Sequence, residues 1–238
     1  MASIQSIKIW ASGNPIPAYL ATPDEDKPHP GLMVFSEIFG INQNIKNVCM
    51  RLAEQGYVAI SIDHFHREEE STSPFDHPEI GLEKRSRLKD SEIIVEIRSA
   101  VDYLKTLKIV KSDCIGSLGF CLGGRLSYLA ACTIAELSAC VVFYGGGIVC
   151  DNPTENMPIA PVAMTEKIQC SVLAHYAEKD HTVPQGHLET IRQSLTNHDK
   201  DHEIIQYPRT LHGFANDSKP CLLYTSPSPR DATLARMP

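Results

Sequence analysis

The sequence predicts an α/β fold, with a mostly parallel central sheet and helices on both of its faces. Short apolar runs of strand length alternate with longer stretches of helical periodicity along most of the chain. Several of these runs are apolar at nearly every position, as in parallel strands that are buried on both sheet faces. The 238 residues, 42% of them hydrophobic, suffice for one domain with a sizeable core. We therefore expect one α/β domain.

The first elements are two paired strands, followed by a strand, a helix and another strand. Residues 4–10 and 16–21 flank the turn-forming cluster Ser12-Gly13-Asn14-Pro15 and should pair as a hairpin. The helix that comes next has a single apolar stripe and should end at Gly56. The predicted strand, helix and second strand of this unit cover residues 31–35, 42–55 and 57–62.

The segment after this unit is charged and irregular. Residues 67–88 are interrupted by two prolines and a glycine, so we expect an excursion that covers an edge of the sheet. A helical stripe returns in residues 89–107. His64 and His66 have a spacing that occurs in metal sites, but no nearby carboxylate or cysteine cluster completes one. No metal is predicted.

Cys121 lies where a predicted strand turns sharply into a predicted helix. An apolar run precedes Gly119-Phe120-Cys121-Leu122-Gly123, and residues 122–135 then carry helical periodicity. This pattern is typical of a nucleophile elbow, here with cysteine in place of serine. In such an elbow a strained turn projects the central side chain, and small neighbours let strand and helix approach. The alternative is a glycine-rich turn with an inert buried cysteine.

An acid and a histidine follow later strands. Asp180 comes after a predicted strand at 171–176, just before a helix that begins near Pro184, and His212 comes after a predicted strand at 204–207. Taken alone, Asp180 could be a helix N-cap and His212 a loop histidine without a catalytic role. Together, the order nucleophile, acid, histidine is that of the α/β-hydrolase triad. The remaining elements expected in this half are a strand at 139–144 and a proline-rich loop at 151–165.

Several short motifs are spread between about residue 4 and residue 214. They are Glu37-Ile38-Phe39-Gly40, Gly56-Tyr57 with Asp63, Gly119-Phe120-Cys121-Leu122-Gly123-Gly124, Tyr144-Gly145, Asp180-His181-Thr182-Val183-Pro184 and His212-Gly213-Phe214. Through these motifs the chain resembles the dienelactone hydrolases, also called carboxymethylenebutenolidases. The resemblance implies that Cys121 attacks an ester or lactone carbonyl, with His212 as the base and Asp180 orienting it. It also implies that Glu37 holds the resting thiol until substrate binds.

Two backbone amides are expected to stabilise the oxyanion of the tetrahedral intermediate. Leu122 follows the nucleophile at the start of a helix, and Ile38 follows Glu37. This chemistry needs no cofactor and no metal. The family grips a substrate carboxylate with two arginines; Arg85 or Arg87 could fill the first position, and Asn216 occupies the second. A different small ester, lactone or thioester is therefore as good a candidate as dienelactone itself.

Composition narrows the class of partner. A net charge of −7 and a pI near 5.8 leave no basic stripe for nucleic acid. The first residues lack a basic segment followed by an apolar core, so we expect no signal peptide, and no apolar run approaches the length of a membrane span. The eight cysteines form no Cys-x-x-Cys pair. We expect a cytoplasmic protein that acts on small molecules, of unpredicted oligomeric state. A non-catalytic hydrolase-fold protein and a redox role for Cys121 are the other open classes.

The last residues differ in character from the rest. Residues 221–238 contain Ser-Pro-Ser-Pro and no apolar stripe, where this fold needs a final amphipathic helix over one sheet face. The segment resembles a translated sequencing adapter, so we expect a non-native tail. The predicted domain is then residues 1–220, with its C-terminal helix missing.

Overall fold

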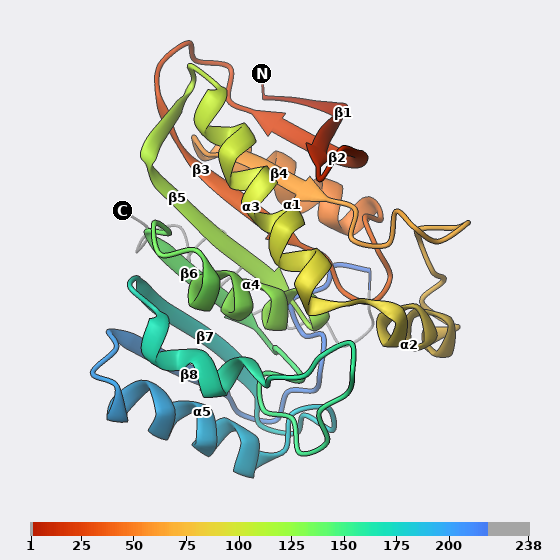
Figure 1. Ribbon diagram of the computed structural model, residues 1–238, viewed down its shortest axis with the longest axis vertical. Helices are drawn as coiled ribbons and strands as arrows, with labels where there is room; N and C mark the ends of the chain where they lie inside the picture. Colours follow the sequence, from red (N-terminus) through yellow and green to blue (C-terminus); the bar gives the residue numbers. More distant parts are fainter. Residues whose placement is uncertain (1, 219–238) are drawn as a thin grey trace.

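The computed structural model describes residues 2–218 (Figure 1). Its centre is one eight-stranded sheet with the strand order β1-β2-β4-β3-β5-β6-β7-β8. β1 pairs antiparallel with β2 and β2 with β4, and all the other pairs are parallel. The strands are β1 (Ser3–Ala11), β2 (Asn14–Thr22), β3 (His29–Phe35), β4 (Val58–Ile62), β5 (Val110–Phe120), β6 (Ala139–Phe143), β7 (Ser171–Ala177) and β8 (His202–Tyr207).

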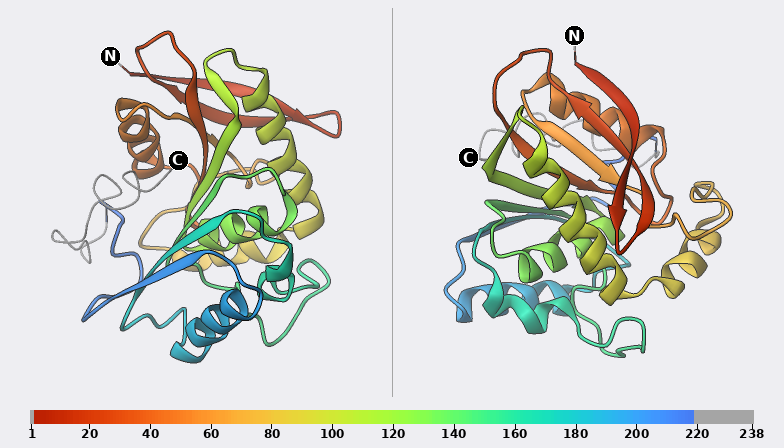
Figure 2. Two further views of the ribbon diagram at one scale, coloured as in Figure 1. Left: turned by 90° about the vertical axis from the view of Figure 1, so that its left-hand side faces the viewer. Right: turned by 45° about the horizontal axis from the view of Figure 1, so that its top comes forward.

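Helices cover both faces of the sheet, as predicted. α1 packs on one face, and α3 lies on the other (Figure 2, left). The buried apolar residues accordingly form two clusters, one of which contains the apolar stripe of α1. The helices are α1 (Gln43–Glu54), α2 (Pro78–Arg87), α3 (Asp90–Thr106), α4 (Leu122–Thr133), the 3-10 helix η1 (Pro161–Lys167) and α5 (Gln185–Asn197). The predicted tail at 221–238 and the predicted loss of a covering helix lie outside the described residues.

The elements that the sequence predicted have identifiable local causes. Asn42 caps α1, since its side chain accepts a hydrogen bond from the Ile45 N–H at 3.2 Å. Gly56 has a φ of +90°, a conformation that favours glycine, and turns the chain from α1 into β4. The hairpin of β1 and β2 turns at Ser12 and Gly13, both with positive φ.

The excursion at 67–88 contains a helix, α2, that the sequence did not predict. Pro78 starts this helix at its first turn, where the missing N–H costs nothing. Gly81 lies so close to Ile38 that an added Cβ would be 2.6 Å from the Ile38 carbonyl oxygen. Lys84 is buried and donates to the carbonyl of Thr72 at 2.8 Å. Tertiary contacts thus hold a helix that lacks an apolar stripe, outside the two helical layers (Figure 1).

A buried ion pair joins α3 to α4. Arg125, 2% exposed, binds both carboxylate oxygens of Asp90 at 2.7 and 2.8 Å. Its Nε donates to the Gly147 carbonyl at 3.1 Å, which ties the loop after β6 to the same pair. The pair therefore fixes one wall of the space at the carboxyl ends of the strands.

Asp90→Ala should lower the free energy of unfolding by about 3–5 kcal/mol, because it leaves the Arg125 charge buried without its partner. Urea unfolding followed by circular dichroism measures the change. Arg98→Ala is the matched control: its ion pair with Glu136 is exposed, so its loss should cost at most about 1 kcal/mol. Equal effects of the two substitutions would contradict the prediction.

Candidate active site

Cys121 sits at a strained turn between β5 and α4. Its φ is +55° and its ψ is −115°, and its N–H donates to the Phe143 carbonyl at 3.0 Å. A Cβ at Gly119 would collide with the Gly123 carbonyl, and a Cβ at Gly123 would collide with the Phe35 carbonyl. Only glycine lets the strand, the turn and the helix approach in this way. The predicted elbow is the geometry found here.

His212 and Asp180 lie together beside this elbow. Nδ1 of His212 is 2.8 Å from one carboxylate oxygen of Asp180 and 3.0 Å from the other. Asp180 also accepts hydrogen bonds from the N–H of Thr182 at 2.8 Å and of Val183 at 3.2 Å. These bonds fix the carboxylate, which in turn fixes the imidazole, as in a triad.

The charges of this pair favour a protonated imidazole. Burial by itself would lower the pKa of His212, but hydrogen bonds with Asp180 and Cys121 outweigh it and raise the pKa to about 10. Burial by itself would raise the pKa of Asp180, but the hydrogen bond and the charge of His212 lower it overall. A protonated imidazole beside a cysteine sulfur is an arrangement that activates thiols.

Aromatic rings pack around His212. The ring of Tyr144 meets it edge-on, with the centroids 5.0 Å apart, and the ring of His181 lies 5.9 Å away. Tyr144 is buried and has a φ of +40°, so its backbone is held in a conformation that is rare for a tyrosine. These two residues were quoted in the sequence motifs, but without any role.

Glu37 and Asn216 form a buried pair, and this corrects the expectation for Asn216. Glu37 is 1% exposed and Asn216 is fully buried. Nδ2 of Asn216 donates to Oε2 of Glu37 at 2.5 Å, and its backbone N–H donates to the Gly213 carbonyl, which turns the residue inward. The prediction that Asn216 occupies a substrate-binding position is wrong, because its side chain donates to Glu37 and the residue does not line the cavity described below.

Asn216→Ala should destabilise the protein by about 1–3 kcal/mol, because it removes the buried hydrogen bond from Nδ2 of Asn216 to Oε2 of Glu37. The measurement is again urea unfolding. Asn47→Ala is the control. Asn47 is an exposed asparagine of α1 whose side chain accepts a hydrogen bond from Gln43 in the same helix. A stability change no larger than that of the control would show that the Glu37 contact contributes nothing.

Cys121 and His212 face a cavity of about 560 Å³ at the carboxyl ends of the strands. Ile38 and Leu122, the predicted oxyanion residues, also line it. Arg85 lines it as well, but Arg87 does not, since Glu68 and Glu83 bind its guanidinium elsewhere on the surface. The other lining residues are Phe39, Pro78, Leu82, Gly146, Gly147, Val149, Cys150, Asp151, Asn152, His181, Thr182 and His187.

Three residues that line this cavity were not predicted from the sequence. The loop after β6 supplies Cys150 and Asp151, and α5 supplies His187. Nε2 of His187 lies 3.2 Å from Oδ2 of Asp151. Cys150 therefore shares a cavity with Cys121, although the two cysteines are distant in the sequence. No local motif signals such residues, because only the folded sheet brings the two segments together.

Within residues 2–218 no cluster of His, Cys, Asp or Glu could hold a metal ion. His64 binds Ser36 and His66 binds Glu96, so the two histidines of the His-x-His pattern point to different partners. In the same described range, no helix has the length and apolar character needed to cross a membrane.

The parallel sheet, the elbow between β5 and α4 and the strand-end positions of acid and histidine define an α/β-hydrolase fold. The family model of the dienelactone hydrolase family matches residues 16–235. The chain belongs to the dienelactone hydrolase family and is a hydrolase.

Relatives agree with this assignment. A Synechocystis protein named "Putative carboxymethylenebutenolidase" is 36% identical over 208 residues, which are 86% of this chain and 83% of that protein. A Bradyrhizobium protein named "Probable 2-oxo-3-(5-oxofuran-2-ylidene)propanoate lactonase" is 32% identical over 209 residues, 87% of this chain and 82% of that one. The crystal structure of a "Putative Dienelactone Hydrolase" from Klebsiella pneumoniae has a TM-score of 0.87 and 28% identity, and the match covers 94% of this chain and 92% of that one.

Proposed function

We propose that the protein is a cysteine hydrolase of small esters or lactones, with Cys121 as nucleophile, His212 as base and Asp180 as the residue that orients His212. The observation that carries this proposal is the strained turn at Cys121, which faces a cavity beside an imidazole bound to Asp180. Family membership and the named relatives support ester or lactone bonds as the bonds that are cleaved.

In the first half of the reaction, Sγ of Cys121 bonds to the carbonyl carbon while its proton resides on His212. The carbonyl oxygen becomes an oxyanion, to which the N–H groups of Leu122 and Ile38 donate. Leu122 is the first residue of α4, so its N–H has no acceptor within the helix. The intermediate then expels the alkoxide, which takes the proton from His212 and leaves an acyl-thioester on Cys121.

In the second half, His212 removes a proton from water, whose oxygen attacks the thioester carbonyl. The C–S bond breaks, the acid is released and Cys121 recovers its proton through His212. In a lactone the alkoxide and the acyl group are parts of one molecule, so the product is a single hydroxy acid. Glu37 lies next to Ile38 and is proposed to control the resting thiol.

The cavity favours a small, mostly apolar substrate. Its walls include Ile38, Phe39 and Leu82, and Arg85 supplies a cation that could meet an acidic group. Because the position of the family's second arginine is Asn216 here, only Arg85 is available to bind a substrate carboxylate, where the family has two arginines. Esters and lactones without a carboxylate therefore remain candidate substrates, and so do thioesters.

A substrate panel tests the proposal. Small esters, lactones and thioesters, each with and without a carboxylate, are assayed for turnover, and p-nitrophenyl acetate serves as the general probe. Acyl transfer is followed by mass spectrometry as an added acyl mass on the peptide that contains Cys121. Turnover without any acyl adduct on Cys121 after acid quenching, even for slowly deacylating esters, would refute the covalent route.

A further inference from the structure

A buried histidine that has no part in this mechanism contacts the loop that carries Glu37 and Ile38. His64 follows β4 and is 1% exposed. Its Nε2 is 3.0 Å from Oγ of Ser36, which is fully buried. Ser36 is the residue immediately before Glu37 and Ile38. The histidine thus binds the short loop that carries the proposed thiol-controlling carboxylate and one of the proposed oxyanion donors.

This loop also contacts the nucleophile elbow. A Cβ at Gly123 would collide with the carbonyl groups of Phe35 and Ser36, so the backbone before Glu37 abuts the start of α4. An oxyanion donor acts only when its N–H lies within about 3 Å of the developing charge. A small shift of Ser36 would therefore be passed on to the Ile38 N–H.

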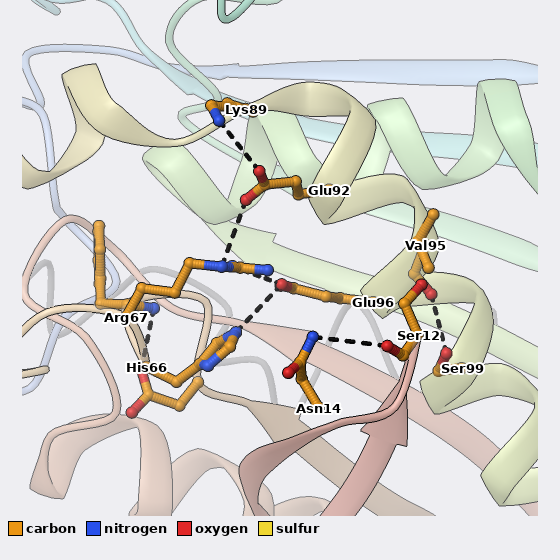
Figure 3. A network of polar contacts seen from close by, with 11 residues as sticks. Ser12, Asn14, His66, Arg67, Lys89, Glu92, Val95, Glu96 and Ser99 are labelled. Carbon is orange, nitrogen blue, oxygen red and sulfur yellow. Dashed lines mark hydrogen bonds and ion pairs between the residues drawn. The ribbon is translucent and has the colours of Figure 1, made fainter.

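Ser36 is the hydrogen-bond partner of His64. Among the described residues Nδ1 of His64 has no hydrogen-bond partner. The nearby carboxylate of Glu96 is not a partner of Nδ1: its Oε1 accepts from His66 at 3.1 Å and from Arg67 at 2.6 Å (Figure 3), and its Oε2 has no hydrogen-bond partner among the described residues. The imidazole is thus held by one hydrogen bond, although a leucine would fill such a space without burying polar atoms.

The charge state of His64 suits a fixed support. Burial lowers its pKa, and His66 acts in the same direction, while the charges of Asp63 and Glu96 oppose this without reversing it. The imidazole is therefore neutral at neutral pH. With the proton on Nε2 it donates to Ser36 and leaves only a lone pair on Nδ1, which is less costly than an orphaned N–H.

We propose that His64 is a positioning residue, which through Ser36 holds in place the loop that carries Glu37 and the Ile38 amide and that abuts the nucleophile elbow. The proposal rests on the proposed function, because it assigns a support to groups whose roles are proposed there. It adds a pair of residues, His64 and Ser36, that touch neither the substrate nor the reacting atoms.

Three substitutions test the link. His64→Leu and Ser36→Ala each remove the hydrogen bond, whereas His64→Gln keeps a donor near the position of Nε2. His64→Leu and Ser36→Ala should each lower kcat for p-nitrophenyl acetate by about tenfold, with KM nearly unchanged, because oxyanion contacts act in the transition state. His64→Gln should keep most of kcat. The double variant His64→Leu/Ser36→Ala should be no worse than the poorer single variant, since both break one link.

A second readout follows Glu37 rather than the oxyanion. The rate at which iodoacetamide labels Cys121 without substrate, measured on its peptide by mass spectrometry, should change in the same two variants and stay near wild type in His64→Gln. His29→Gln is the control for loss of a buried histidine, because His29 lies at the opposite end of β3 and binds the backbone of Glu25 and Gly56. It should leave kcat and labelling unchanged.

Wild-type kcat and labelling in His64→Leu and Ser36→Ala would overturn the proposal, as would additive losses in the double variant or an equal loss in His29→Gln. If His64→Leu does not fold, Ser36→Ala alone decides, since it removes one oxygen atom. Failure of the proposed function is distinguishable: it would appear as activity that survives loss of Cys121, whatever the His64 variants do.

Discussion

Cys121→Ala is expected to abolish ester hydrolysis, lowering kcat/KM for p-nitrophenyl acetate by roughly 10⁴-fold or more. The substitution removes the atom that forms the covalent bond, and neither the oxyanion donors nor the cavity can replace it. The fold should persist, because a φ of +55° strains alanine no more than it strains cysteine, and only one sulfur atom is lost. Circular dichroism and urea unfolding check that point.

Cys150→Ala is the matched control for Cys121→Ala. It removes a thiol from the same cavity but not from the elbow, so turnover should stay near wild type. Near wild-type activity in Cys121→Ala, or an equal loss in both variants, would end the nucleophile assignment.

Cys121→Ser should keep only a small fraction of the activity. A serine hydroxyl is far harder to ionise than a thiol, and His212, with its pKa raised to about 10, is arranged to sit beside sulfur. Pre-steady-state acylation separates slow attack from slow deacylation. Acylation as fast as in the wild type would show that the site does not depend on a thiol.

The order of strands and helices was predictable because each element carries its own signal. Buried parallel strands such as β3 are apolar throughout, and α1 has an apolar stripe, a cap at Asn42 and a stop at Gly56. The elbow was predictable for the same reason. The turn at Cys121 admits only glycine at positions 119 and 123, and these two glycines are visible in the sequence.

The features that sequence reasoning missed depend on contacts between distant segments. α2 has no apolar stripe, and it is held by the approach of Gly81 to Ile38 and by the hydrogen bonds of Lys84. Asn216 follows His212 by four residues, but a turn at Gly213 directs its side chain inward to Glu37. A direction of this kind cannot be inferred from spacing within a loop.

His212→Gln is expected to lower kcat/KM by about 10³-fold. Glutamine can occupy much of the space of the imidazole, but it cannot take a proton from the thiol or return it to the leaving alkoxide. Acylation and deacylation should both slow, because the same imidazole serves both steps. Stopped-flow measurement of p-nitrophenol release, with mass spectrometry of the acyl adduct, resolves the two.

The pH profile sharpens this test. In the wild type the proton on His212 is held by Asp180 and Cys121 up to a pKa of about 10, so the rate of iodoacetamide labelling of Cys121 should vary little with pH near neutrality. In His212→Gln the sulfur loses its cationic partner, and the labelling rate should rise steeply with pH, as for an ordinary thiol. His181→Gln is the control, because His181 lines the same cavity 5.9 Å from His212 without a bond to Asp180. An unchanged labelling profile in His212→Gln, or the same change in His181→Gln, would show that His212 does not activate Cys121.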